Sequence, residues 1–453
     1  MTMQKTSTLL EDTAQRAVEY ITNLQHKKVF PDQNAIQQLR EYLDTPLPGQ
    51  GTEPQRVIAQ LDQFASPATV ASAGGRYFGF VTGGALPASL AANWLAGAWD
   101  QNGFSPVSSP AVAAIEETAL RWLKEVLLIP AEAEGALTTG ATMANFTCIA
   151  AARHKVLQQV GWDVEANGLL GAPNVHVVIG DQVHGTVLKV LAMLGLGRQR
   201  VIRVPADEQG RMRADSLPDL QGPIILCIQA GNVNSGAFDP ASEIMAWARE
   251  RKAWVHVDGA FGLWAAVVPE LQHLVAGYDQ ADSWASDCHK WLNVPYDCGV
   301  ALVRDPAAIQ GAMSISGAYL MLSDQQRSAI DVTPDSSRRA RAVDVWAALK
   351  YLGRTGLAEM VRNHCRQAHW LASELRGAGI EVLNDVVINQ VLVAFGVDDR
   401  TRAVIQKLQS SGECWCGGTQ WRDRQAMRIS VSSWATTDID MQRTRDAILD
   451  AAA

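Results

Sequence analysis

From about residue 110 to residue 303, helix-like and strand-like stretches alternate along the chain. Apolar side chains recur on one face of residues 112–128, and residues 143–159 are also helix-like. Short apolar runs between polar, glycine or proline residues indicate buried strands, at 175–179, 201–204, 223–228, 253–258, 282–286 and 299–303. Because most of these runs lead through a loop into a helix, the pattern predicts an α/β fold with a mostly parallel central sheet.

The pattern changes around residues 352–356. A helix over 357–376 leads into a second block, in which 386–395 and 427–431 resemble strands and 438–449 resembles a helix. Before residue 75 the chain is helical at 11–26 and then rich in turn residues. We therefore predict an N-terminal helical segment at 1–75, a large domain at 76–355 and a small C-terminal α/β domain at 356–453.

Composition narrows the classes of function. The 453 residues include 39 Lys and Arg against 47 Asp and Glu, so a net charge of −8 offers no basic surface for nucleic acid or anionic membranes. No apolar run reaches the roughly 18 residues of a membrane span. The seven cysteines are odd in number and lie mostly in apolar stretches, which is typical of reduced thiols in the cytoplasm. Cys414 and Cys416 have no second pair or histidine nearby, so we expect no metal site.

Two charged residues lie at the ends of predicted strands. Asp258 closes the run at 253–258, and Lys290 follows His289 just after the run at 282–286. A lysine there is costly to bury unless its charge is paired, although a lysine that snorkels to the surface would give the same pattern. Because ligands bind at the carboxyl ends of parallel strands, both side chains can face one crevice.

A possible phosphate site precedes the helix at 143–159. Gly140, Ala141 and Thr142 would place backbone N–H groups at its positive end, although ordinary helix capping explains the same residues. His184 begins another helix after a strand, where a structural role is the alternative. A phosphate site, an aspartate and a lysine on successive strand ends are the groups that a pyridoxal phosphate enzyme needs.

Four motifs resemble the group II pyridoxal phosphate-dependent amino acid decarboxylases, which include the aromatic amino acid and glutamate decarboxylases. They are GRYFGFVTGG at 75–84, SPAVAAIEE at 109–117, HVDGAFG at 256–262 and SDCHKW at 286–291. The resemblance runs from about residue 74 to the C-terminus. It implies the fold type I (aspartate aminotransferase-like) architecture, with the cofactor in the large domain.

The resemblance also assigns roles to residues. Lys290 would bond to the cofactor aldehyde, Asp258 would pair with the pyridine nitrogen, and His184 would stack on the ring. Ala260 would pack under the ring, and His289 would lie beside the lysine. Gly140, Ala141 and Thr142 would hold the phosphate.

Two positions depart from the family pattern. Asp287 stands where many members have an asparagine near the phosphate, and a carboxylate that faced a phosphate would be repelled. Asn232 stands where the family implies a threonine-like hydroxyl near the cofactor, and its amide can still form hydrogen bonds. We keep both among the expected cofactor contacts.

Decarboxylation is favoured by residues 314–320, which resemble the catalytic loop of the family. Tyr319 occupies the position of the tyrosine that protonates the carbanion left by CO₂, although a tyrosine that only packs in a loop is the alternative. The segment from 75 to 104 resembles the family's substrate cleft. We expect substrate contacts from Arg76, Phe78, Phe80 and Phe104, with an aromatic amino acid slightly preferred over an acidic one.

The sequence is compatible with other functions as well. A carbon–carbon lyase or an aminotransferase would use the same cofactor, and an aminotransferase would need a carboxylate-binding arginine such as Arg428. A protein that binds pyridoxal phosphate without catalysis is the third hypothesis. From the resemblance we also expect a homodimer with shared active sites. The partners would therefore be a small amino acid and a second copy of the chain.

Overall fold

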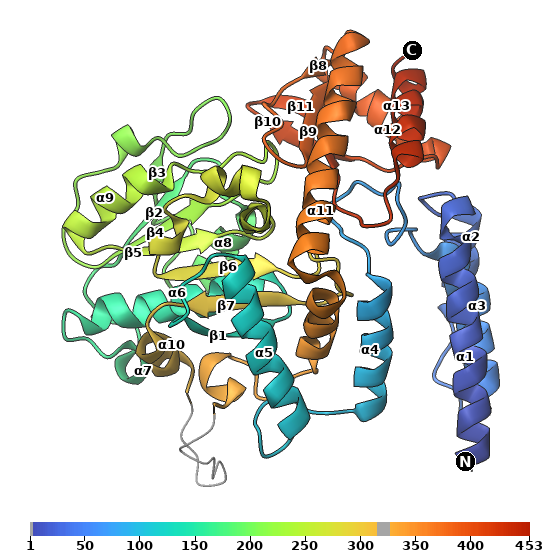
Figure 1. Ribbon diagram of the computed structural model, residues 1–453, viewed down its shortest axis with the longest axis horizontal. Helices are drawn as coiled ribbons and strands as arrows, with labels where there is room; N and C mark the ends of the chain where they lie inside the picture. The colour runs from blue at the N-terminus through green and yellow to red at the C-terminus, as the bar shows by residue number, and fades with distance from the viewer. Residues whose placement is uncertain (1–2, 315–326) are drawn as a thin grey trace.

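A seven-stranded sheet forms the centre of the large domain in the computed structural model, which describes residues 3–314 and 327–453 (Figure 1). Its strand order is β1-β7-β6-β5-β4-β2-β3. Only β7 runs antiparallel to its neighbours, so the expected mostly parallel sheet is confirmed. The strands are β1 (Glu134–Thr138), β2 (His176–Gly180), β3 (Ile202–Val204), β4 (Ile224–Gln229), β5 (Trp254–Asp258), β6 (Ser283–Asp287) and β7 (Gly299–Val303).

Helices cover both faces of this sheet, which explains why the central strands are rich in apolar and small residues. Every residue of β4, β5, β6 and β7 is buried. One apolar core contains α6 (Ala141–Gln158), α8 (Gly185–Met193) and α10 (Pro306–Met313). The other contains α5 (Pro110–Val126), α9 (Ala241–Arg251) and the first part of α11 (Arg341–Gly377). The short helix α7 (Val164–Asn167) lies beside α6.

The C-terminal part of the chain forms a separate antiparallel sheet of order β10-β11-β9-β8. Helix α11 enters it after a break at Gly353 (φ 59°, ψ −175°), two residues before the boundary expected at 355. The second part of α11 and two further helices pack on this sheet around a core of their own. The elements are β8 (Glu381–Val382), β9 (Gln390–Ala394), α12 (Asp398–Ser411), β10 (Gly417–Trp421), β11 (Arg424–Ser430) and α13 (Asp438–Ala452).

The N-terminal helices lie at the side of the molecule (Figure 1). α1 (Met3–Asn23), α2 (Gln33–Leu43) and α3 (Pro54–Ala65) contain no buried residue within their bounds. α4 (Pro87–Trp99) packs against α11 and leads into the large domain. No helix in the described ranges is both long and apolar enough to cross a membrane. Short 3₁₀ helices are η1 (Leu24–His26), η2 (Ser66–Ala68), η3 (Ala214–Ser216), η4 (Gly262–Val267), η5 (Pro269–Val275), η6 (Tyr278–Gln280) and η7 (Ala329–Val332).

Candidate active site

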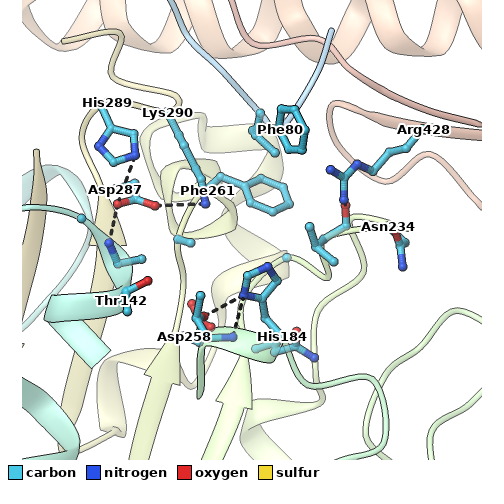
Figure 2. Close-up of a pocket in the computed structure, with 18 of the residues that line it drawn as sticks. Phe80, Thr142, His184, Asn234, Asp258, Phe261, Asp287, His289, Lys290 and Arg428 are labelled. Atoms are coloured by element: carbon cyan, nitrogen blue, oxygen red, sulfur yellow. Dashed lines mark hydrogen bonds and ion pairs between the residues drawn. The ribbon is translucent and has the colours of Figure 1, made fainter. Parts of the chain in front are cut away.

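A cavity of about 660 Å³ lies at the edge of the sheet where β1, β4, β5 and β6 end. Parallel strands present their carboxyl ends on the same side, so residues far apart in the sequence meet there. Figure 2 shows Lys290 near the centre of the view, with Asp287, His289 and Thr142 to one side and Arg428 and Asn234 to the other. Asp258 and His184 lie at the strand ends below it.

Lys290 pairs with Asp287 across the turn that follows β6. Lys290 Nζ lies 3.0 Å from Oδ2 of Asp287, and this carboxylate is only 2% exposed. Oδ1 of Asp287 accepts a 2.6 Å hydrogen bond from the backbone N–H of Ala141, the first residue of α6. The lysine charge is therefore compensated inside the cavity, and the interpretation of Lys290 as a surface lysine does not apply.

His289 is held in one orientation by its neighbours. Its Nδ1 accepts a 3.1 Å hydrogen bond from the Cys298 N–H, so in the neutral ring Nε2 carries the proton. Nε2 lies 3.6 Å from Oδ1 of Asp287. The ring stacks on Tyr296 with centroids 4.3 Å apart. Burial lowers the pKa of His289, partly opposed by the charge of Asp287, so a neutral ring is favoured.

Asp258 and His184 form the floor of the cavity. Burial raises the pKa of Asp258, and the nearby His184 and Lys290 oppose that rise. Burial also lowers the pKa of His184, and its Nδ1 is 2.7 Å from the Thr186 hydroxyl, which fixes the plane of the ring. A buried carboxylate beside a neutral aromatic ring suits a flat heterocycle with a protonated nitrogen.

The start of α6 forms a tight cradle. Gly140 adopts φ 150°, and a Cβ there would come within 3.1 Å of His289 and 3.3 Å of Asp287, so a side chain would crowd this corner. Thr142, Ala141 and Gly140 all line the cavity. A helix N-terminus, a lysine and a buried carboxylate together fit the phosphate, aldehyde and pyridine nitrogen of pyridoxal phosphate. Ala260 also lines the cavity, as expected for a small residue near the ring.

The structure corrects the expectation for Arg76. Its guanidinium is buried away from the cavity, where it donates to the backbone carbonyls of Glu413, Gln25 and Lys27. It also lies 3.7 Å from Asp440 of the small domain. Since these partners occupy the guanidinium, Arg76 joins the N-terminal segment to the small domain and does not face a substrate in its own chain.

Three other expected contacts do not line this cavity. Phe78 is 1% exposed and belongs to the core of the small domain. Phe104 is half-buried outside the cavity. Asn232 holds a turn, because its Oδ1 accepts from the N–H groups of Asn234 and Ser235. Tyr319 lies outside the described residues, so its role stays a prediction.

Several cavity residues were not singled out from the sequence. Asn234, rather than Asn232, is the asparagine of that turn that lines the cavity. Thr419, Tyr296 and Phe261 also face it. Arg428 was named only as an aminotransferase candidate, yet its half-buried side chain reaches the cavity from β11, and burial lowers its pKa. The sequence carries no signal for this direction, because buried and partly exposed residues do not alternate along β11.

Comparison with known proteins decides the family. Residues 37–397 match the family described as the pyridoxal-dependent decarboxylase conserved domain. The chain belongs to this family. Within the family, it is 30% identical over 393 residues to the aromatic-L-amino-acid decarboxylase of Drosophila lebanonensis, which covers 80% of this chain and 94% of that one. It is 29% identical over 361 residues to an acidic amino acid decarboxylase of Xenopus tropicalis, covering 77% and 70%.

A solved structure supports the same fold for this pyridoxal-dependent decarboxylase. The crystal structure of Oryza sativa TDC with PLP and tryptamine superposes with a TM-score of 0.91 at 22% identity, covering 100% of this chain and 98% of that one. The fold type I architecture is therefore confirmed, as is a carboxy-lyase that uses pyridoxal 5'-phosphate on an amino acid. Relatives named for aromatic and for acidic substrates match at similar identity.

Proposed function

We propose that this decarboxylase converts an L-amino acid to the amine and CO₂, with an aromatic side chain preferred over an acidic one. The observation that carries the preference is Phe80, whose ring lines the cavity while 62% exposed. Phe80 and the next residue, Val81, both adopt left-handed backbone angles, φ 54° and 60°. Such angles are strained, above all for a β-branched residue, and strain of this kind collects at ligand sites. An aromatic substrate would bury this exposed ring.

The residues around the cofactor have distinct tasks. Bound pyridoxal phosphate supplies an electron sink for the bond that breaks at the substrate α-carbon. Lys290 would hold the cofactor aldehyde carbon, and Ala141 and Thr142 would hold the phosphate at the start of α6. Asp258 would keep a proton on the pyridine nitrogen, because a buried carboxylate needs a positive partner. His184 would lie flat against the ring, held by Thr186.

Arg428 supports a second candidate, an acidic substrate. The guanidinium donates to the Val233 carbonyl at 3.2 Å and forms no ion pair with the described carboxylates. A carboxylate that leaves as CO₂ loses its charge, so pairing it with Arg428 would stabilise the ground state more than the transition state. A side-chain carboxylate would keep its charge throughout. Arg428 is therefore better suited to the end of an acidic side chain.

A substrate panel separates the two candidates. CO₂ release and amine formation would be measured for L-tyrosine, L-tryptophan, L-glutamate and L-cysteine sulfinate, with Phe80→Ala and Arg428→Gln beside the native enzyme. We expect kcat/KM to be highest for an aromatic substrate and to fall on the order of tenfold in Phe80→Ala for that substrate. Turnover of only the acidic substrates, lost in Arg428→Gln, would establish the second candidate. A keto acid product in place of the amine would contradict both.

We also infer a homodimer, which exposed apolar side chains support. Trp94 and Trp99 on α4 are each 43% exposed, and Leu95 between them is 54% exposed. The two tryptophans do not line the cavity, so a wall for the substrate in the same chain is not their role. A two-fold interface would cover them. Light scattering should give twice the chain mass, and a monomer with full activity would contradict this inference.

We propose a cytoplasmic location. The seven cysteines are all free and buried, which suits a reducing compartment. Localisation of a tagged full-length chain would test this.

A further inference from the structure

The Asp287 carboxylate accepts a hydrogen bond from the Ala141 N–H, a donor that the cofactor phosphate would also use. Its Oδ1 accepts from Ala141 N–H at 2.6 Å, and Ala141 opens the 18-residue helix α6 at the cradle. The carboxylate is 2% exposed and lines the cavity. Figure 2 shows the Asp287 side chain between Lys290 and the N-terminus of α6.

The lysine and the histidine beside Asp287 compensate the charge of its carboxylate. Lys290 Nζ is 3.0 Å from Oδ2, and His289 Nε2 is 3.6 Å from Oδ1. Cofactor binding would draw on these same groups, since Lys290 would hold the aldehyde and the Ala141 N–H would hold the phosphate. A single backbone N–H supports one short hydrogen bond, so two anionic acceptors compete for it. Two like charges in a buried corner also repel each other.

We propose that the Asp287 carboxylate competes with the cofactor phosphate for the Ala141 N–H. The phosphate group then adds less to cofactor affinity than it would if the N-terminus of α6 were free of the carboxylate. Asp287 is a positioning residue for Lys290 and His289 and, at the same time, a restraint on phosphate binding. An asparagine at this position would keep the size of the side chain and remove the charge.

The test compares two forms of the cofactor. The apoenzyme and its Asp287→Asn variant would be titrated with pyridoxal 5'-phosphate and with pyridoxal, which lacks the phosphate, and binding would be followed by visible absorbance. Both ligands use the same ring contacts and the same lysine. The ratio of their dissociation constants therefore isolates the phosphate, and any change in Lys290 basicity cancels. We expect this ratio to favour the phosphorylated form on the order of tenfold more in Asp287→Asn.

Two further variants keep the test decisive. Asp287→Ser removes the charge with a smaller side chain and should shift the ratio in the same direction, so a folding defect in one variant does not end the experiment. Asp297→Asn is the matched control, because Asp297 pairs with Arg341 and does not line the cavity. Its ratio should stay at the native value. An unchanged or lower ratio in both Asp287 variants would overturn the proposal, and neither result depends on the substrate.

Discussion

The Thr419 hydroxyl donates a 2.9 Å hydrogen bond to Oδ1 of Asn234. Thr419 lies on β10 of the small domain, and Asn234 lies in the turn that follows β4 of the large domain. Both residues line the cavity, and Arg428 adds a second bond from the small domain to the carbonyl of Val233. The bond from Thr419 leaves the amide nitrogen of Asn234 as the donor for a ligand.

Thr419→Val should weaken substrate binding. The change keeps the shape of the side chain but removes the donor, which is worth about 1 kcal/mol or roughly fivefold in affinity. We expect KM to rise several-fold while kcat changes little, because Asn234 is then free to rotate. Steady-state kinetics with the best substrate of the panel would measure this. Thr419→Ser keeps the hydroxyl and is the control; equal KM values in the two variants would contradict the role of the bond.

Gly83 allows the loop that contains Phe80 and Val81 to pack directly on the backbone of Lys290. A Cβ at this position would lie 1.8 Å from the Lys290 carbonyl oxygen, and backbone cannot move aside cheaply. Gly83→Ala should therefore lower the free energy of unfolding by about 2 kcal/mol, typical of overpacking, and should reduce the cofactor absorbance.

Gly377→Ala is the control for this change. Gly377 is the last residue of α11 with nothing within 4 Å of the added Cβ, and alanine favours a helix. Its melting temperature should stay the same or rise. If Gly83→Ala kept the native melting temperature and the native absorbance, the loop would have moved to accommodate the Cβ, and the prediction would be wrong.

His364 should make the enzyme sensitive to acid. The buried ring accepts a 2.9 Å hydrogen bond from Trp291 Nε1 at its Nδ1, and burial lowers the pKa of His364 to about 4. The unfolded chain binds the proton near pH 6.5. Stability from the neutral ring is complete above pH 6.5 and is lost as the pH falls toward 4, by up to about 3 kcal/mol. In His364→Gln, the free energy of unfolding should therefore fall less between pH 7 and pH 5. Urea unfolding at pH 7, 6 and 5 would measure it.

The comparison between variants is needed because other buried groups act in the opposite direction. Burial raises the pKa of Asp239 and of Asp344 to about 6, so these carboxyls favour the folded state as the pH falls. His26→Gln, at an exposed site, is the control and should follow the native curve. An acid dependence of His364→Gln identical to the native enzyme would contradict the assignment to His364.

The chemistry at the strand ends could be predicted from the sequence because it is local. Asp258 ends β5 and Lys290 follows β6, and both strands are short runs of apolar and small residues that are buried throughout, so they can be recognised without knowledge of the fold. The cradle at Gly140 could also be predicted, because the backbone N–H groups at the start of a helix form such a site locally. β1 and β10 were missed, since both contain glycine, which weakens the residue pattern of a strand.

The sequence by itself therefore determined the α/β class, and it predicted candidate cofactor residues and their order along the chain. Only the tertiary structure decided which side chains of the loops face the cavity. Asn232 and Asn234 are two residues apart, and a turn with Gly236 at φ 77° directs one to the backbone and the other to the cavity. Arg76 and Arg428 are equal in charge, but in the folded chain Arg76 donates to backbone carbonyls and Arg428 lines the cavity. Such choices depend on contacts between distant segments, which local patterns of residues do not encode.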